Sequence, residues 1–590
     1  MCGVIGVAGN QNVIPVLLSS LKKLEYRGYD SAGVATLCGG HAVVRKGVGS
    51  LETVERSHRL ADLEGAIGIG HVRWATHGGV TEANAHPHFD CKHLTAVVHN
   101  GIIENYQELR TELGKRHTFS SETDTEVIAH LIEDNMVNGT RLEQAVGKAI
   151  KRLKGSYAIL AVSGKDPHKI VAARKDSPLI VGVGDGQNYV ASDALCFSGK
   201  TDRVIYVQDN EVVVITHRDI SILDGEQKAI GRAPIQIEQN WQDATKQDYP
   251  YFMIKEIMEQ PTAIRRAAMQ DSGLMMDIAM DILRSNNVVF TACGTSRHAA
   301  LIGRYVFSRL GGKFSDVINA SEFQYFSDSV DRNTLVVAIS QSGETADVIS
   351  GVREAKERGA KIFSVVNVVG STLDRLSDQR LYLNCGPEIA VAATKSFAAQ
   401  LVIFYQLAFA MVNRLEAGHR KLDLLAGRVA DNLELCMNEL SDVAASLRDE
   451  RDFYYLGRGI NFAVAAEGAL KLKEIAYVHA EGMPAGELKH GTLALIEQGT
   501  PIVAVCPADS TYADTMSNVA ETKARGGYVV GVSDRDHSLF DARITIPEVE
   551  EVFYPLVSIP PLQFLAYYSA VIRGLNPDRP RNLAKSVTVK

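Results

Sequence analysis

The amino-acid sequence predicts an α+β sandwich followed by two doubly wound α/β domains, and three observations support this fold class. The chain has 590 residues, which is more than a single hydrophobic core normally serves. Up to about Ile235 it contains many short β-like runs with amphipathic helical stretches between them. The remainder alternates strands with helices and contains an internal repeat.

The N-terminal part supplies the elements of the sandwich. The expected strands are Gly3–Ala8, Ala66–His71, Leu94–His99, Tyr157–Val162 and Val212–Ile215, and the expected helices include Val13–Leu24 and Thr125–Asp134. From Ile235 to Tyr251 the chain becomes polar, as linkers are, with the run Glu238–Asp243 at its centre. A helix is expected over Tyr251–Glu259, ended by Pro261.

The internal repeat lies in the C-terminal half. Leu335–Ile339 matches Ile502–Cys506, and Arg358-Gly359 matches Arg525-Gly526 at the same spacing. Each copy has the order strand, glycine turn, helix, strand, loop, helix, strand, which is typical of a doubly wound parallel sheet. Ligands of such domains bind at the carboxyl ends of the strands, so a binding site is expected in the loops there.

Bulk properties exclude several functions. The formal net charge is −8 and no long basic run is present, so a nucleic acid is not an expected partner. No apolar run approaches the roughly 18 residues of a membrane helix, and the N-terminus lacks the basic segment of a signal peptide. The eight cysteines are scattered without CxxC pairs, which argues against disulfides and zinc and favours a reducing cytoplasm.

Cys2 follows the initiator methionine directly. A small second residue permits removal of Met1, which leaves a cysteine carrying both a thiol and a free α-amine. The α-amine has a pKa of about 7.7–8.0, so it can serve as the base that activates its own thiol. Taken alone, Cys2 is more simply explained as a buried thiol at the start of a strand.

Other residues of the N-terminal part favour catalysis. Arg73 follows a predicted strand and can bind a carboxylate through two parallel hydrogen bonds, while Asp124 can pair with an ammonium group. Together they would hold the backbone of an amino acid. The side-chain amide of Asn100 and the N–H of Gly101 can stabilise a tetrahedral oxyanion.

Histidines of the same region raise the question of a metal. They have no standard zinc-binding spacing, so no metal is expected. These histidines are His71, His77, His86, His88, His93 and His99.

The N-terminal motifs resemble the class II glutamine amidotransferases, whose domain is an N-terminal-nucleophile α+β sandwich. The motifs are Cys2–Gly6, Tyr26–Gly33, Arg73–Gly78, His99–Gly101 and Ser121–Glu126. The resemblance implies that Cys2 attacks the side-chain amide of L-glutamine and releases ammonia, with Asn100 and Gly101 as the oxyanion hole. It assigns glutamine binding to Arg73, Trp74, Thr76, His77 and Asp124, with Trp74 gating the path of ammonia.

Ser340–Thr345 follows an expected strand and opens a helix. Hydroxyls and backbone N–H groups at a helix N-terminus can hold a phosphate without lysine or arginine, although a serine-rich capping turn has the same pattern. The second copy has Pro507–Tyr512 at this place and lacks the hydroxyl pattern, which favours phosphate binding in the first copy only. No GxxxxGK[ST] loop is present, so a nucleoside triphosphate is not indicated.

Residues that can carry acid–base and amine chemistry occur in the second copy and near the C-terminus. A carboxylate can move a proton, an imidazole can act as an acid or a base, and a lysine amine can form an imine with a carbonyl group. Glu474 lies on an expected helix, His490 in a following loop and Lys585 near the C-terminus. Surface charges and a solvated tail are the commoner explanations of such positions.

The loops of the repeat resemble sugar isomerase (SIS) domains, and the combined set resembles the glutamine–fructose-6-phosphate aminotransferases (isomerising) from Cys2 to Val589. That resemblance implies L-glutamine and fructose 6-phosphate as substrates, glucosamine 6-phosphate as product, and no cofactor. It assigns the proton shuttle to Glu474, the imine to Lys585, and ring opening to His490 of a neighbouring subunit, which implies a homodimer. The residues assigned to the phosphosugar are Thr295, Ser296, Ser340, Gln341, Ser342, Thr345, Val391, Glu467, Lys471 and Ala584.

Some positions depart from the pattern of that family. Ala393 stands where a serine is frequent, which puts one contact to a sugar hydroxyl in question. Arg297, Thr492 and Lys590 also differ, but none of them removes a proposed acid, base or nucleophile. The expected domains are residues 2–235 (amidotransferase), 236–280 (linker and connecting helix), 281–425 and 450–575 (SIS), and 576–590 (a tail carrying the imine lysine).

Several other functions share part of this pattern. An asparagine synthetase needs an SGGxDS loop, which is absent, and a phosphoribosyl pyrophosphate amidotransferase needs a different C-terminal fold. A phosphosugar sensor has no need for Cys2, Glu474, His490 and Lys585 together. An aminating isomerase of another ketose phosphate is the alternative that the sequence excludes least firmly.

Overall fold

The computed structural model describes residues 2–137, 139–237 and 245–588. The chain divides into two compact units. The N-terminal unit is Met1–Trp241 with Ser586–Lys590, and the C-terminal unit is Gln242–Lys585. The expected polar run Glu238–Asp243 and the C-terminal Lys590 lie outside the described residues.

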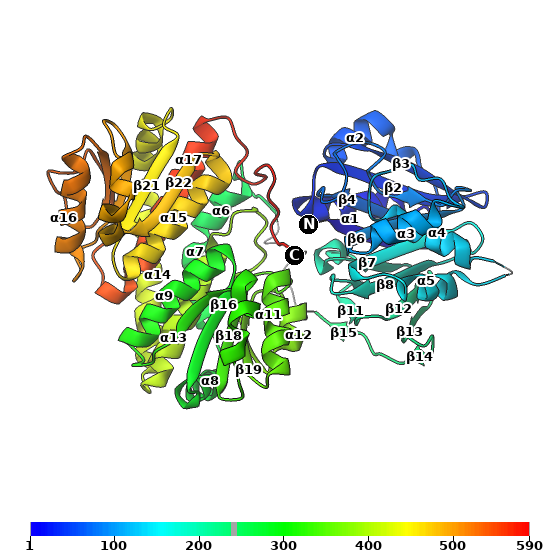
Figure 1. The fold of residues 1–590 in the computed structure, drawn as a ribbon, viewed down its shortest axis with the longest axis horizontal. Coiled ribbons are helices and arrows are strands. Elements are labelled where there is room, and N and C mark those ends of the chain that lie inside the picture. The colour runs from blue at the N-terminus through cyan, green and yellow to red at the C-terminus, as the bar shows by residue number, and fades with distance from the viewer. Residues whose placement is uncertain (1, 138, 238–244, 589–590) are drawn as a thin grey trace. The chain divides into compact units, whose positions relative to one another are not determined.

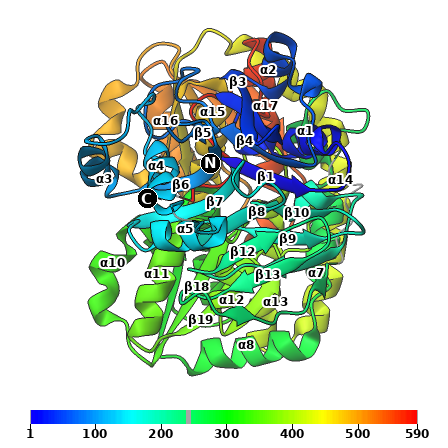
Figure 2. The same ribbon diagram turned by 90° about the vertical axis from the view of Figure 1, so that its right-hand side faces the viewer.

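Two antiparallel sheets form the middle of the N-terminal unit (Figures 1 and 2). The first contains β1 (Gly3–Ala8), β2 (Ser31–Cys38), β3 (His41–Val48), β4 (Ile67–Arg73), β9 (Ile180–Val183), β10 (Asn188–Ala191), β11 (Arg203–Tyr206) and β15 (Ile235–Gln236). Their order is β15-β11-β9-β10-β1-β4-β2-β3. The second contains β5 (His88–Phe89), β6 (Thr95–Ile103), β7 (Gly155–Ser163), β8 (Ile170–Lys175), β12 (Val212–Ile215), β13 (Ile220–Leu223) and β14 (Ala229–Ile230). Their order is β14-β13-β12-β8-β7-β6-β5.

Helices cover the outer face of each sheet. The helices on the first sheet are α1 (Ile14–Leu24) and α2 (Leu51–His58), and those on the second are α3 (Tyr106–Leu113), α4 (Glu126–Asn135) and α5 (Leu142–Ile150). Alternation along β1 explains the layers, because Ile5 and Val7 join the core under α1 whereas Val4 and Ala8 face the second sheet. The unit is an α/β/β/α sandwich, which confirms the expected α+β class.

The C-terminal unit contains two parallel sheets that repeat one topology (Figure 1). The first sheet has β16 (Asn287–Ala292), β17 (Asp316–Asn319), β18 (Thr334–Ser340), β19 (Lys361–Val366) and β20 (Gln379–Tyr382). The second has β21 (Asp452–Gly457), β22 (His479–Pro484), β23 (Pro501–Val505), β24 (Tyr528–Ser533) and β25 (Ala542–Thr545). Their orders, β17-β16-β18-β19-β20 and β22-β21-β23-β24-β25, confirm the duplicated doubly wound domain.

The strand order reverses beside the first strand of each copy. In the first copy this point lies between β16 and β18, and the crevice outside their carboxyl ends is where such sheets bind ligands. Thr295 and Ser296 lie there in the first turn of the helix that follows β16, and Ser340–Thr345 extends from the end of β18. The topology therefore brings two of the expected phosphosugar segments to one edge of one sheet.

Helices surround both sheets and join them into one core. Those of the first copy are α9 (Gly294–Arg309), α10 (Phe323–Phe326), α11 (Ala346–Glu357), α12 (Thr372–Leu376) and α13 (Lys395–Met411), and those of the second are α15 (Ile460–Ala476), α16 (Tyr512–Lys523) and α17 (Tyr554–Ile572). The connecting helices are α6 (Phe252–Met258), α7 (Gln260–Ala268), α8 (Ser272–Arg284) and the long α14 (Leu415–Ser446). A continuous apolar cluster extends through α7, α13, α14, α15 and α17, so the two copies share a hydrophobic interior.

The sequence predicted that Pro261 ends a helix, but in the structure it also lies at the start of the next one. The expected helix is α6, and Pro261 then stands in the first turn of α7, which begins one residue earlier at Gln260. A proline is favourable there because its missing N–H has no partner in the first turn of a helix. The interval 236–280 thus holds more helix than the single one expected.

The expectation that no segment reaches the length of a membrane helix is wrong. Glu551–Ile572 is 22 residues long with a mean hydropathy of 1.3, long and apolar enough to cross a membrane. Pro560 and Pro561 obscured its helical pattern in the sequence, although both lie inside α17. Because 83% of its most apolar window is buried in the structure, the segment is accounted for as a core helix.

Candidate active sites

Cys2 lies directly before β1, at the edge where β4 ends. Gly3 pairs with Val72, which places the Cys2 sulfur 3.4 Å from both the carbonyl oxygen and the amide nitrogen of Trp74. Gly28 makes this packing possible, because a Cβ there would lie 2.6 Å from the carbonyl carbon of Arg73. The nucleophile expected from the sequence is thus held by backbone contacts.

Arg73 organises the loop after β4. Its guanidinium donates to the carbonyl oxygens of His77 (2.6 Å), Gly78 (3.2 Å) and Gly79 (3.2 Å), and its side chain is buried. Asp30 supports the same loop by accepting a hydrogen bond of 2.8 Å from the N–H of Ala75. Part of the donor capacity that was expected to bind a carboxylate therefore shapes the loop itself.

The Cys2 sulfur opens onto a pocket in the N-terminal unit. Asp124 is buried there and accepts a hydrogen bond of 2.8 Å from the N–H of Ile103, which fixes its carboxylate. The residues that line the pocket are Cys2, Arg73, Trp74, Thr76, His77, His86, His99, Gly101, Thr123, Asp124 and Thr125. The structure thus brings together every residue expected to bind glutamine.

The expected oxyanion hole lies beside Cys2. The Asn100 side-chain amide donates to the Cys2 carbonyl oxygen at 3.0 Å, so Asn100 is within reach of the nucleophile. Gly101 has a φ of 131°, and a Cβ there would lie 2.1 Å from the carbonyl oxygen of Ser156. Only glycine fits this backbone, and its N–H orientation depends on that conformation.

The environment of Cys2 works against a free thiolate. Burial raises the pKa of the thiol, and the nearby Asp124 carboxylate adds to this effect. The N-terminal ammonium, the Trp74 N–H and the Arg73 guanidinium act in the opposite direction. A thiol with a raised pKa needs a base within reach, and the α-amine of Cys2 itself can be that base once Met1 is removed.

Buried histidines pack around the pocket. Burial lowers the pKa of His71 to about 3 and that of His86 well below its ordinary value, so both rings are neutral. The two rings stack at 4.1 Å, and His99 contacts Thr125 through Nδ1 at 2.9 Å. His86, His99, Thr123 and Thr125 also line the pocket, although no role was assigned to them from the sequence. His99, Thr123 and Thr125 stand in the motifs His99–Gly101 and Ser121–Glu126, which were the signal that could have found them.

In the C-terminal unit the expected phosphate loop joins β18 to α11. The Ser340 hydroxyl lies 2.8 Å from that of Thr345 and accepts a hydrogen bond of 3.1 Å from the N–H of Gly343. The Ser342 hydroxyl accepts another, of 3.2 Å, from the N–H of Glu344. Hydroxyls and N–H groups therefore converge in front of a helix N-terminus, which suits a phosphate.

The second copy differs in chemistry at the equivalent loop. The Asp509 carboxylate accepts hydrogen bonds from the Thr511 N–H (2.8 Å), the Thr511 hydroxyl (2.7 Å) and the Asn461 side-chain amide (2.7 Å). A carboxylate of the chain already occupies these donors. This arrangement agrees with the interpretation that the first copy alone binds phosphate.

Charged side chains of α15 lie in the interior, not on a surface. Glu467 and Lys471 are completely buried, and Thr295 joins them by donating to Glu467 at 2.9 Å and accepting from Lys471 at 3.0 Å. Lys471 also forms an ion pair with Glu474. Burial raises the pKa of Glu474 despite this pairing, and a carboxyl group with a raised pKa is suited to carrying a proton.

Lys585 is buried as well, and is therefore not a solvated tail residue. Its amine lies 2.6 Å from Oε2 of Glu388, whose other hydrogen bonds come from Thr394 (2.9 Å) and Ser396 (3.0 Å and 2.7 Å). Burial by itself would raise the pKa of Glu388, but the Lys585 ammonium and the hydrogen bonds from Lys585, Ser396 and Thr394 together lower it to about 2. Glu388 was missed because nothing in its local sequence marks it as the partner of a residue so distant in the chain.

The remaining expected residues are less tightly connected. Ser296 accepts a hydrogen bond of 3.0 Å from Gln400, Val391 is buried, and Gln341 and Ala584 are half-buried. His490 is exposed, and in the described part of the chain its side chain has no hydrogen bond to Glu474 or Lys585. His298, which contacts Glu467 at 2.7 Å, and Gln400 were not expected at the site.

Comparison with known families defines the class of protein first. Residues 71–198 match a family described as "Glutamine amidotransferase domain", and residues 281–410 and 446–573 both match one described as "SIS domain". A solved structure titled as the C-terminal domain of glucosamine-fructose-6-phosphate aminotransferase from Francisella tularensis is 33% identical. It covers 57% of this chain and 99% of its own, with a TM-score of 0.53.

Full-length relatives then define the particular family. Curated proteins of Thermococcus kodakarensis and Pyrococcus horikoshii are each 45% identical, and one of Methanothermobacter thermautotrophicus is 46% identical. All three are covered completely, as is this chain, and each is named glutamine–fructose-6-phosphate aminotransferase (isomerizing). The chain belongs to this family.

We expect Gly101→Ala to lower the turnover number for glutamine hydrolysis by about 100-fold or more, the effect of losing one oxyanion donor. The added methyl group collides with the Ser156 carbonyl and displaces the Gly101 N–H. Glutamate release in a coupled assay measures the effect. Gly231→Ala is the control, because a Cβ there meets no atom within 4 Å. A folded Gly101→Ala protein with ordinary turnover would show that this N–H does not stabilise the oxyanion.

We expect Glu388→Gln to remove part of the acid sensitivity of the C-terminal unit. The pKa of Glu388 is lowered to about 2 in the folded protein, so its stabilisation is present above about pH 4.5 and is lost as the pH falls toward 2. The loss amounts to about 3 kcal/mol. The variant should be less stable than wild type at pH 7, and the difference should shrink toward pH 2.

Urea unfolding midpoints measured from pH 7 to pH 2 test this expectation. Glu357→Gln, at an exposed position of α11, is the control and should follow the wild-type curve. If the difference between Glu388→Gln and wild type stays constant over this range, the pairing with Lys585 does not lower the pKa of Glu388.

Proposed function

We propose that this chain hydrolyses L-glutamine in its N-terminal unit and uses the ammonia in its C-terminal unit to convert fructose 6-phosphate into D-glucosamine 6-phosphate. The observation that carries the proposal is the presence in one chain of two separate groups of reactive side chains. Cys2 stands at a pocket that collects the glutamine-binding residues, and Lys585 is buried against Glu388. Full-length relatives named for this reaction support the choice of substrates.

The first half-reaction begins at the Cys2 sulfur. The α-amine takes the thiol proton while sulfur attacks the side-chain carbonyl carbon of glutamine, and Asn100 with the Gly101 N–H stabilises the oxyanion. The C–N bond then breaks, and the proton held by the amine passes to the leaving nitrogen as ammonia forms. Water hydrolyses the thioester and releases glutamate. Arg73 and Asp124 hold the α-groups of glutamine, and Trp74 gates the departure of ammonia.

The second half-reaction uses the Lys585 amine. It reacts as the free amine, so a proton must first pass from Lys585 to water, while Glu388, 2.6 Å away, holds the lysine side chain in place. The amine adds to C2 of the open sugar and water leaves, which forms an imine; ammonia then replaces lysine. Glu474 moves a proton from C1 to C2, which converts the ketose imine into the amino aldose. The Ser340–Thr345 loop holds the phosphate, and no step draws on a cofactor.

The assembly we propose is a homodimer that works in the reducing cytoplasm. His490 is exposed at the end of a 3₁₀ turn (Ala485–His490), where it can serve a site of a second copy. In a closed two-fold dimer each chain can contribute its His490 to the site of the other chain, so both sites are completed. Reducing conditions keep Cys2 as the free thiol that the first half-reaction requires.

The central test is the product balance. With glutamine and fructose 6-phosphate, mass spectrometry should detect glucosamine 6-phosphate and glutamate in equal amounts. Cys2→Ala should abolish both products, whereas Lys585→Ala should abolish only the amino sugar; Cys38→Ala, at an exposed cysteine, is the control. Glutamate without amino sugar in the wild type would indicate a different ketose phosphate, and glutamine hydrolysis by Cys2→Ala would refute the first half-reaction.

A heterodimer tests the sharing of His490. His490→Ala and Lys585→Ala should each be inactive in amino-sugar synthesis when purified alone. Co-expression with two affinity tags yields a heterodimer in which one site has both residues intact, so activity should return. Absence of activity in a heterodimer whose two mutant chains are both folded would show that His490 acts within its own chain.

A further inference from the structure

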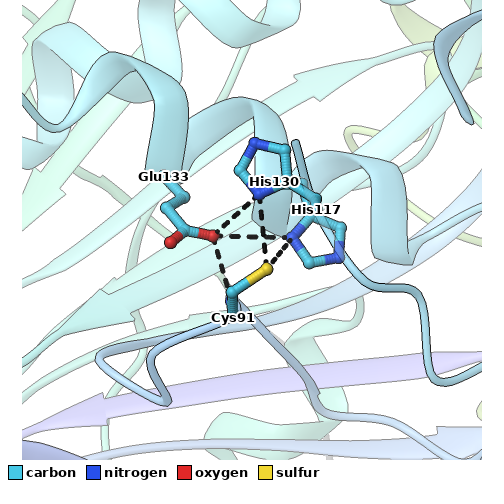
Figure 3. A group of neighbouring side chains, drawn as sticks. All are labelled: Cys91, His117, His130 and Glu133. Atoms are coloured by element: carbon cyan, nitrogen blue, oxygen red, sulfur yellow. Dashed lines mark hydrogen bonds and ion pairs between the residues drawn. The ribbon is translucent and has the colours of Figure 1, made fainter. Parts of the chain in front are cut away.

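Four side chains from three segments of the N-terminal unit converge on one point (Figure 3). Cys91 lies in the turn between β5 and β6, His117 in the loop between α3 and α4, and His130 with Glu133 on α4. His130 and Glu133 are three residues apart and so project from the same face of the helix. One ligand-type atom of each side chain lies within 4.8 Å of those of the others.

The distances between these atoms match a tetrahedral metal site. The Cys91 sulfur lies 3.4 Å from Nδ1 of His117 and 3.6 Å from Nδ1 of His130. Oε2 of Glu133 lies 3.2 Å from Nδ1 of His117 and 3.6 Å from Nδ1 of His130. Zinc bonds of 2.0–2.3 Å in a tetrahedron place the ligand atoms about 3.3–3.8 Å apart. The four distances fall close to this spacing before any ion is present.

A carboxylate behind His117 orients that imidazole, because Nε2 of His117 lies 2.9 Å from Oδ1 of Asp134. Nε2 of His130 is buried without a hydrogen bond and lies 3.7 Å from Oε1 of Glu126. When Nε2 carries the proton and faces a carboxylate, Nδ1 presents its lone pair to a metal. Metal-binding histidines usually have a partner of this kind.

A hydrogen-bonded network without a metal explains the arrangement less completely. A protonated His117 between Asp134 and Glu133 would account for that ring alone. It does not account for a thiol and a second imidazole facing the same point, because the thiol hydrogen can be donated to only one Nδ1 at a time. The N–H of Cys91 donates to Oε2 of Glu133 at 3.0 Å, which holds that carboxylate oxygen beside the sulfur.

We propose that Cys91, His117, His130 and Glu133 form a binding site for a structural zinc ion. A thiolate, two imidazoles and a carboxylate are a donor set that favours zinc over magnesium or calcium, which prefer oxygen. Four protein ligands fill a tetrahedral shell and leave no open position for a substrate, which is the property of a structural site. The six histidines considered in the sequence are not part of this site. The absence of CxxC pairs, which argued against zinc, does not apply to Cys91, because its proposed co-ligands come from other segments.

The site would tie together segments that build the glutamine pocket. β6, which follows the Cys91 turn, carries Asn100 and Gly101, and the loop after His117 carries Asp124. Glu126 already fastens that loop by accepting hydrogen bonds from Ser120 and Ser121. A bound ion would add a cross-link between the turn, the loop and α4, and so hold one wall of the pocket in place.

Metal content is the decisive measurement. Tag-free protein is incubated with equimolar Zn²⁺, passed through a desalting column and analysed by mass spectrometry for metals. The wild type and Cys38→Ser, which alters another exposed cysteine of the same unit, should retain one zinc per chain. Cys91→Ser should lose it, and Asp134→Asn, which removes the partner of His117, should bind zinc about 10–100-fold more weakly.

Two further readouts separate loss of the metal from loss of the fold. Zinc should raise the thermal unfolding midpoint of the wild type and of Cys38→Ser but not that of Cys91→Ser, whose substitution lies at an exposed position. Co²⁺ should give a thiolate charge-transfer band with wild type and with Cys38→Ser but not with Cys91→Ser. Wild type without zinc after incubation, or Cys91→Ser with as much zinc as wild type, would overturn the proposal. The measurement counts metal and so does not depend on glutamine hydrolysis.

Discussion

The burial of charge is the constraint on which the C-terminal unit depends. A lysine or glutamate in an apolar interior is strongly destabilising unless an opposite charge or several hydrogen bonds accompany it. Lys585 meets this condition through Glu388, and Lys471 meets it between Glu467 and Glu474. Removing one member of such a pair leaves the other charge buried and unpaired, so the reactive groups and the fold stabilise each other.

Much of this arrangement could be predicted from the sequence, because local patterns specify local structure. Period-two alternation and short apolar runs located β1, β4, β6, β7 and β12, and the internal repeat identified two copies of one parallel sheet. The motifs around Cys2 and the loop Ser340–Thr345 were found because their residues are contiguous. The least local inference, that Lys585 belongs to the site, depended on resemblance to a family and not on any pattern in the tail.

What the sequence did not disclose depends on contacts between distant segments. Glu388 approaches Lys585 across nearly two hundred positions, and Cys91, His117 and His130 come from three separate segments with no metal-binding spacing. α17 was missed as a long helix because its internal prolines interrupt the pattern, although both lie within the helix. Such features are determined by tertiary packing, which the local patterns of a single sequence do not specify.

Asp509 shows how a duplicated domain can give up a ligand without losing its architecture. In the second copy this carboxylate is held by the donors of its own loop, so the chain itself supplies an anion there. Under the proposed function, the first copy holds the phosphate of the sugar and this loop does not compete for it. Duplication would then separate two tasks that one domain would have to share, phosphate binding in one copy and the supply of acids, bases and packing surface in the other.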